Sequence, residues 1–539
     1  MDRKWWTLLA VCVGTFMLLL DVTIVNVALP AIQVSLKSSF SDLQWVVDAY
    51  SLALAALLLT TGSLADLFGR RLVFMIGLVI FSVSSLASGL ASDPLWLNLA
   101  RAAQGVGGAA MFSTSLALLG SAFQGRERGT AFGVWGAITG LAVAIGPVIG
   151  GALTTGLSWR WIFLVNVPIG VVAIVLCLLR VDESRQRGAH RVDPIGVVSF
   201  SGALGALVYA LIKGNSSGWG STVIVACLVG AAVLLTVFLV AELIQGEDAM
   251  FDLGLFRKPT FTGGSIAAFS LSAGLFAMLL YLTLYLQDVL GFSALKTGLR
   301  MLVLSGGILL TSTLAGRLTA HVPIRFLIAP GLALVGIGLL LMRGLTPDSQ
   351  WTHLIPGFIV AGAGTGLINP PLASTAIGVV PPQRAGMASG INSTFRQVGI
   401  ATGIAGLGSL FSHKVRTEIE SLLAHAPHIS APAVHKLAEG VSQGSGVGGG
   451  LSKLPAAARP AAIHAVRSGF VAGLNQIFLI GAALTLVSAV LTLILIRSRD
   501  FEAGAARGPN TGAQGPAGLP SPPQAGRGPS GEPAPQPTR

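Results

Sequence analysis

The sequence predicts an all-α membrane protein that crosses the lipid bilayer many times. Only 10% of its 539 residues are charged and 53% are apolar, whereas a soluble domain is about 25% charged. A soluble surface cannot be built from so few charges. Charge-free stretches such as 129–159 and 468–496 exceed the roughly 20 residues that a helix needs to cross the bilayer. Alternating ten-residue patterns, typical of membrane barrels, are missing from the sequence.

Apolar length and turn signals predict fourteen membrane spans. They cover residues 7–30, 43–63, 72–92, 95–120, 129–156, 161–180, 194–213, 219–242, 260–287, 295–315, 324–343, 352–379, 385–411 and 470–496. An even number of spans places both termini on one side, and this side holds 20 of the 34 Lys and Arg residues. Because positive charge favours the cytoplasmic side, we expect a multi-pass protein of the cell (inner or plasma) membrane with both termini in the cytoplasm.

An internal repeat divides the chain into two similar halves. The stretch from Gly105 to Gly133 matches the stretch from Gly362 to Gly390 at a constant offset of 257 residues. A second match, between 62–71 and 316–325, has an offset of 254 residues. Such duplication is typical of transporters made of two six-helix bundles. The expected domains are an N-terminal six-helix bundle (1–182), a linker with two inserted spans (183–258), a C-terminal six-helix bundle (259–499) and a disordered cytoplasmic tail (500–539).

The segment 412–468 between the last two spans is expected to be a long external loop with short amphipathic pieces. It holds five of the eight histidines, namely His413, His425, His428, His435 and His464. A pH-sensing or metal-binding role is one interpretation of this cluster. Their irregular spacing favours a solvated loop, and no metal site is predicted.

Charged side chains inside the spans are candidates for a functional site, because each costs about 2.5–3.5 kcal/mol or more there. At about 1.5 Å per residue, Asp21 lies about 9 Å from the outer face of the bilayer, Asp48 about 7 Å and Arg101 about 9 Å. The three side chains therefore share one level of the first bundle. A carboxylate whose distance to an arginine changes with conformation can load and release protons. The alternative for Asp21 and Arg101 is a static ion pair, and Asp48 alternatively reaches the lipid headgroups.

Small residues and one proline form a second pattern, in the fifth span. Gly146, Gly150 and Gly151 allow a close approach of neighbouring helices, and Pro147 permits a bend. General helix packing is the alternative reading of these glycines.

Five segments together resemble the major facilitator superfamily, specifically its fourteen-span drug:proton antiporter family. They are residues 20–30, 62–71, 99–105, 146–151 and 159–170. The resemblance implies the major facilitator fold with two inserted helices, and a role for Arg101 in proton transfer. It associates the glycine and proline segment of the fifth span with export. It also implies a conformational latch at the cytoplasmic ends of the second and third spans, formed by Gly62, Asp66, Gly69, Arg70 and Arg71.

The second half departs from the first at the repeated positions. Ala320 stands where Asp66 would repeat, Pro323 where Gly69 would, and Leu275 lies near the position that repeats Asp21. The carboxylate chemistry is therefore expected in one half only. Polar residues that are candidates for lining a substrate cavity are Asn26, Gln104, Tyr281, Tyr285, Asn369, Asn392 and Arg396. For Arg396, static packing is an equal alternative.

These patterns predict a proton-coupled exporter that moves hydrophobic or amphipathic drugs or antibiotics by alternating access. The alternatives are an uncoupled facilitator and an exporter of an endogenous metabolite. A membrane sensor or an enzyme is less well supported, because neither a His/Glu metal cluster nor a nucleophile–base pair stands out. The expected partners are a small-molecule substrate, protons and lipid. Nucleic acid is not expected, because the basic residues lie at span ends. No cofactor is expected, because the sequence has no P-loop, and the protein is expected to be a monomer.

Overall fold

The computed structural model describes residues 2–38, 40–184, 193–245, 251–319, 321–381, 384–424, 430–442 and 455–500, and in these ranges the chain forms helices and no strand. The first half contains α1 (Arg3–Leu36), α2 (Phe40–Phe68), α3 (Arg70–Gly89), α4 (Pro94–Ala122), α5 (Gly125–Gly156), α6 (Trp161–Leu164) and α7 (Asn166–Arg180). The inserted pair is α8 (Pro194–Ser217) and α9 (Thr222–Gln245), followed by the short η2 (Leu253–Arg257). The second half contains α10 (Pro259–Leu271), η3 (Ser272–Phe276), α11 (Ala277–Leu284), η4 (Tyr285–Val289), α12 (Ala294–Leu318), α13 (Arg325–Met342), η5 (Trp351–Leu354), α14 (Ile355–Gly378), α15 (Ala385–Leu423), α16 (Ala431–Ser442), η7 (Ala456–Ala458), α18 (Arg459–Leu495) and η8 (Ser498–Asp500).

All fourteen predicted spans coincide with helical segments of the structure. Among the described residues, twelve helices are long and apolar enough to cross a membrane, and the bent α5 makes a thirteenth. The remaining predicted span corresponds to α15, which packs against α2, α10 and α18 and carries Asn392, Ser393, Thr394 and Arg396 in its buried part. These polar residues lower its mean hydropathy. The predicted all-α polytopic fold is confirmed.

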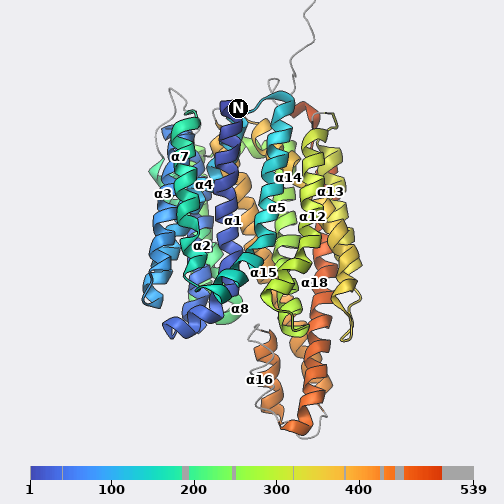
Figure 1. Ribbon diagram of the computed structural model, residues 1–539. Helices are drawn as coiled ribbons and strands as arrows, with labels where there is room; N and C mark the ends of the chain where they lie inside the picture. Colours follow the sequence, from blue (N-terminus) through green and yellow to red (C-terminus); the bar gives the residue numbers. More distant parts are fainter. Residues whose placement is uncertain are drawn as a thin grey trace, which may run out of the picture.

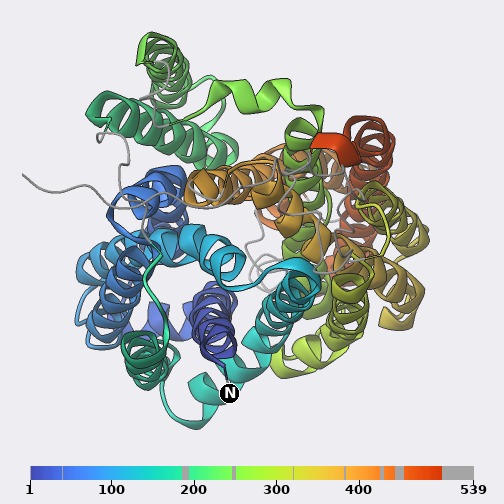
Figure 2. The same cartoon turned by 90° about the horizontal axis from the view of Figure 1, so that it is seen from above.

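The helices form two groups with the inserted pair at their edge (Figures 1 and 2). One apolar core joins α10 to α18 in the second half, and two smaller cores lie in the first half. Seen from above, α8 and α9 lie outside the two groups, and α8 packs against both α2 and α15. This arrangement agrees with the expected order of halves and insert, while the domain boundaries stay a prediction.

The repeat reappears as two crosswise contacts between the halves. Gly62 of α2 lies against the backbone of Gly386 in α15, and Gly316 of α12 lies against the backbone of Gly129 in α5. The offset of 254 residues relates Gly62 to Gly316, and the offset of 257 residues relates Gly129 to Gly386. The internal repeat therefore relates the two contacts to each other. Both lie at the end of the bundle that holds the N-terminus, because Lys4 is paired with Glu127 near the start of α5. The two halves are therefore in backbone contact at this end.

The segment expected to be a loop is helical over much of its described length. The amphipathic pieces predicted at 415–423 and 457–466 are continuations of α15 and α18, and α16 packs beside them at the end opposite the N-terminus (Figure 1). The two continuations stay helical because apolar side chains on each, such as Val415 and Val466, are buried in a shared core. Of the five histidines, His425 and His428 lie outside the described residues, as does the tail 501–539.

Charged residues at the surface of this helical extension interact with one another. Oε1 of Glu420 accepts a hydrogen bond from Nε of Arg416 (3.0 Å) and lies 3.1 Å from Nδ1 of His435. Hydrogen bonding to the Arg416 guanidinium lowers the pKa of the exposed Glu420 carboxyl group. Among the described residues, no group of three His, Cys, Asp or Glu side chains could hold a metal ion.

Candidate functional site

The centre of the first half contains a fully buried ion pair. Arg101 of α4 binds Oδ2 of Asp21 of α1 through Nη1, and both side chains are at most 1% exposed. The two residues were predicted to share one depth from their positions along the spans, and the structure brings them into direct contact. Because removing two charges from water is costly, such a pair needs further hydrogen bonds to be tolerated.

Neutral polar side chains supply these bonds. Gln104 donates from Nε2 to Oδ1 of Asp21 (2.9 Å), and its Oε1 accepts from Nη1 of Arg101 (2.7 Å). Asn166, the first residue of α7, donates to the same oxygen of Asp21 (3.2 Å). The hydroxyl group of Ser85 in α3 accepts from both Gln104 (3.3 Å) and Asn166 (3.1 Å). Side chains from α1, α3, α4 and α7 therefore meet in one buried network.

Arg101 also connects the network to α2. Its Nε donates to the backbone carbonyl of Val46 (2.9 Å), and its guanidinium group lies 4.3 Å from the centre of the Tyr50 ring. A desolvated guanidinium over an aromatic face gains about 2 kcal/mol. The network thus connects Asp21 to residues of five helices of this half, namely α1, α2, α3, α4 and α7.

Asp48 has a different partner from the one that its depth suggested. Its carboxylate forms an ion pair with Lys213 near the end of α8 (2.8 Å), with the side chains 18% and 10% exposed. Lys213 also lies over the ring of Trp45 at 5.2 Å, and Trp45 contacts Tyr209 of α8. The pair connects the inserted helix to the first half, and the role of Asp48 in proton coupling stays a prediction.

We expect the pair of Asp48 and Lys213 to stabilise the protein. Asp48→Asn or Lys213→Met leaves a mostly buried charge without its ion-pair partner, which costs about 3 kcal/mol. Each single variant should lower the melting temperature of the purified protein, and the double variant should recover most of the loss. Additive losses in the double variant would show that the two charges do not stabilise each other.

The predicted latch residues join the two halves at the end that holds the N-terminus. Asp66 forms an ion pair with Arg70 (2.8 Å). Its two carboxylate oxygens also accept from the backbone N–H groups of Gly386 (2.9 Å) and Met387 (2.8 Å) at the start of α15. A carboxylate at a helix N-terminus is stabilised by the unpaired N–H groups and by the helix dipole. Asp66 is therefore positioned to hold α15 of the second half against α2 of the first.

The turn between α2 and α3 depends on a glycine and on a residue that the sequence did not reveal. Gly69 has a φ of +117°, a conformation that other residues rarely adopt. A side chain there would collide with the carboxylate of Glu183. Glu183 accepts from the backbone N–H groups of Arg71 (3.1 Å) and Leu72 (3.1 Å) and so caps α3, while Arg71 binds the carbonyl of Leu178 (2.8 Å). Glu183 lacks any signal in the sequence, because it lies just after the sixth span, 112 residues along the chain from Arg71, whose N–H group it binds.

The glycine and proline segment of α5 packs against α1. Side chains at Gly146 or Gly150 would collide with Thr23 or Ile24, respectively. The helix bends by 41° between Val143 and Ile145. Pro147 cannot donate to the carbonyl four residues earlier, which explains a bend at this place. Gly151 lies in the same stretch, and its backbone carbonyl accepts a hydrogen bond from the hydroxyl group of Thr155 (2.6 Å).

The candidates for a substrate cavity fall into three environments. Gln104 belongs to the Asp21 network, and Tyr281 and Tyr285 lie in the apolar core of the second half with their hydroxyls bonded to backbone carbonyls. The side chain of Asn26 lies outside the described residues. The cavity role of these residues stays a prediction.

The remaining candidates form a buried polar cluster between α14 and α15. The guanidinium of Arg396 donates to Asn392 (3.3 Å) and Asn369 (3.2 Å), and its second terminal nitrogen has no bonding partner among the described residues. None of the ion pairs between described residues includes Arg396. A buried cation with amide partners only remains able to bind a polar group that enters between the helices.

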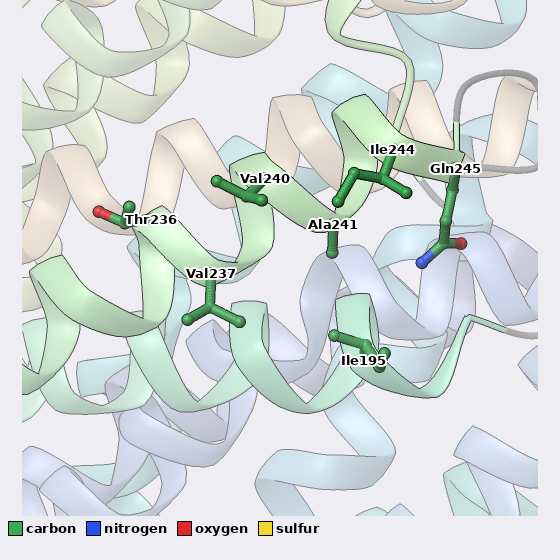
Figure 3. A pocket seen from close by; sticks show the side chains of 7 residues that line it. All are labelled: Ile195, Thr236, Val237, Val240, Ala241, Ile244 and Gln245. Carbon is green, nitrogen blue, oxygen red and sulfur yellow. The ribbon is translucent and has the colours of Figure 1, made fainter.

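One groove of about 430 Å³ lies on the inserted pair, distant in sequence from the Asp21 network. Figure 3 shows its lining, which comes from α8 and α9 and consists of Ile195, Thr236, Val237, Val240, Ala241, Ile244 and Gln245. The neighbouring apolar side chains are exposed, with Ile244 at 80%. Such a surface is stable only in contact with lipid.

Two repeated helical halves, the first of which holds a buried ion pair, are typical of a membrane transporter. The chain belongs to the Major Facilitator Superfamily, whose family model matches residues 11–404. It is 39% identical over 421 residues to the multidrug resistance protein Stp of Mycobacterium tuberculosis (strain CDC 1551 / Oshkosh), covering 78% of each chain. It is 32% identical over 507 residues to the tetracenomycin C resistance and export protein of Streptomyces glaucescens, covering 93% of each. The human organic anion transporter MFSD10 has a similar fold, with a TM-score of 0.60 at 15% identity over 91% of this chain and 100% of that one.

Proposed function

We propose that this transporter exports hydrophobic or amphipathic drugs or antibiotics from the cytoplasm in exchange for protons. Relatives that match most of the chain are named for drug resistance and export, which supports export as the direction. The observation that carries the coupling is the buried contact between Asp21 and Arg101. This contact supports a proton site at Asp21, because an ionisable side chain buried within a membrane span is a candidate functional site.

The network supports a reaction cycle in which proton and substrate alternate. In this conformation Asp21 is paired with Arg101, and the halves are closed against each other near Gly62 and Gly129. Asp21 and Arg101 belong to the same bundle, so the cycle requires α1 and α4 to shift against each other while the two bundles rock. This shift changes the distance between the carboxylate and the guanidinium, and with it the affinity of Asp21 for a proton. A proton that enters from outside thereby drives the return of the substrate-free transporter. No cofactor takes part, and the proton gradient supplies the energy.

The latch stabilises one state of the cycle. Asp66 binds the start of α15 only while α2 and α15 are in contact. Its bonds therefore favour the conformation in which the end that holds the N-terminus is closed. By the positive-inside rule this end faces the cytoplasm, and the protein acts as a monomer in the cell membrane.

Transport in everted membrane vesicles tests the proposal. Ethidium, a hydrophobic cation, and tetracenomycin C serve as probes, because the relatives differ in the substrates that their names give. Coupled export predicts accumulation of a probe inside the vesicles that requires an imposed pH gradient and collapses with a protonophore. Accumulation that only follows the gradient of the probe itself would instead identify an uncoupled facilitator.

A second candidate is the export of a metabolite made by the same cell. The similarity to the tetracenomycin C resistance and export protein favours it. Growth tests of a susceptible host with a panel of drugs separate these cases. Protection against many unrelated compounds indicates multidrug export, whereas protection against one compound indicates a dedicated exporter.

A further inference from the structure

Asn166 occupies an unusual position beside the buried ion pair. Between α6, which ends at Leu164, and α7, which begins at Asn166, one residue, Val165, interrupts the sixth predicted span, and its dihedral angles stay helical. This one-residue interruption is the break between α6 and α7. The side chain is fully buried. Its Nδ2 donates to Oδ1 of Asp21 (3.2 Å) and to Oγ of Ser85 (3.1 Å), whereas its Oδ1 has no hydrogen-bond partner among the described residues. A buried oxygen without a partner costs about 1–3 kcal/mol, so its presence calls for an explanation.

A protonated Asp21 would need an acceptor that this network otherwise lacks. An ionised carboxylate only accepts hydrogen bonds, but a carboxylic acid must also donate one. Arg101 has donors only, and Oε1 of Gln104 is occupied by Nη1 of Arg101. The oxygen of Asn166 remains available, and rotation of the amide about its last bond exchanges the places of oxygen and nitrogen.

We propose that Asn166 is a positioning residue for proton coupling, whose amide donates to ionised Asp21 and, after rotation, accepts from protonated Asp21. The proposal rests on the proposed proton-coupled function. It adds a residue that serves both protonation states of the carboxyl group without itself gaining or losing a proton.

The same rotation would act on the break between α6 and α7. Ser85 donates its hydroxyl hydrogen to the carbonyl of Phe163 (2.9 Å), just before the break, while accepting from Asn166. After rotation, the oxygen of Asn166 faces Ser85 as a second acceptor. The hydroxyl hydrogen is then shared between Asn166 and Phe163, which weakens the bond that holds α6 to α3. Protonation of Asp21 is thereby transmitted to the backbone of the sixth span.

The test compares the pH dependence of ethidium transport in everted vesicles for wild type, Asn166→Leu and Asn166→Ser. Leucine is similar to asparagine in volume, but its side chain neither donates nor accepts hydrogen bonds. Hydrogen bonds to a charged group are stronger than those to a neutral one. Removing the amide of Asn166 therefore destabilises the ionised form of Asp21 more than the protonated form. We expect the midpoint of the pH profile to move upward by about one pH unit in Asn166→Leu. Asn166→Ser keeps a group that donates and accepts, and should lie closer to wild type.

Ser88→Ala is the matched control, because the buried hydroxyl of Ser88 binds only its own helix, at the carbonyl of Ser84 (2.9 Å). It should keep the wild-type profile. Exchange of labelled ethidium without a gradient checks that each variant is folded, and Asn166→Ala, which also removes the donor and the acceptor, carries the test if Asn166→Leu does not fold. A wild-type pH profile in folded Asn166→Leu or Asn166→Ala would overturn the proposal. A wild type without any pH-driven transport would instead overturn the proposed function.

Discussion

Asp21→Asn is expected to reduce proton-driven export to the level of vesicles without the protein. Asparagine has nearly the shape of aspartate, so its oxygen can still accept from Gln104 and Asn166. It cannot bind or release a proton in the physiological range. The transporter should therefore still exchange labelled substrate across the membrane without a gradient, while an imposed pH gradient no longer drives accumulation.

The same substitution should also lower stability, because Arg101 is 1% exposed and loses its counter-charge. Leaving a buried charge unpaired costs about 3–5 kcal/mol. The remaining bonds of Arg101 to Gln104, Val46 and Tyr50 reduce this cost. Arg101→Gln added to Asp21→Asn should restore the melting temperature without restoring coupled export. This double variant separates a loss of coupling from a loss of folded protein.

Gradient-driven uptake of ethidium into everted vesicles measures the effect. Asp182→Asn is the control, because this exposed carboxylate pairs with Arg3 at the surface and with no other charged residue of the described ranges, and it should transport like wild type. Wild-type accumulation by Asp21→Asn at equal protein levels would show that the proton binds elsewhere and that the pair with Arg101 is structural.

Depth along a span could be predicted from the sequence, but direction around the helix axis could not. Counting residues put Asp21, Asp48 and Arg101 at one level, and the first and third do meet. Asp48 lies at a similar level, yet its side chain binds Lys213 of the inserted α8. A position in the sequence gives the height of a residue at about 1.5 Å per residue, whereas its neighbours depend on how the helices pack.

Two neutral members of the Asp21 network, Ser85 and Asn166, were missed for a related reason. Ser85 and Asn166 are single polar residues in apolar spans, where such residues commonly bind the backbone of their own helix. Asn166 lies in a segment that supported the family resemblance, but the sequence does not show its orphaned oxygen. The segment 412–468 was expected to be a loop with short amphipathic pieces, and those pieces extend α15 and α18 because their apolar side chains are buried against neighbouring helices.

Gly62→Val is expected to have the second large effect, by forcing apart the two halves where they touch. A Cβ atom at Gly62 would lie 2.5 Å from the carbonyl oxygen of Gly386 and 3.2 Å from the Cα of Gly390. Both obstacles are backbone atoms of α15, which cannot move aside as a side chain does. Since carbon atoms prefer separations of about 3.5 Å or more, α2 and α15 must separate by about 1 Å. The bonds from Asp66 to the start of α15 then lengthen beyond hydrogen-bond distance.

The closed conformation at this end should lose about 1–3 kcal/mol relative to the open one. This energy shifts the ratio of the two conformations by about 5- to 150-fold. The distance between spin labels attached at Phe68 and Arg384, measured in a variant without Cys12, Cys177 and Cys227, should therefore move to longer values, and coupled export should fall by a similar factor.

Two further glycines make the test specific. Gly129→Val should have the same effect as Gly62→Val, because Gly129 meets Gly316 in the repeat-related contact. Gly230→Val is the control, because no atom lies within 4 Å of a Cβ built at this position in α9. If the label distance in Gly62→Val stayed as in Gly230→Val, backbone contact between the halves would not hold this end closed. The latch would then depend on Asp66 and its ion pair alone, and Asp66→Asn would have to produce the whole shift by itself.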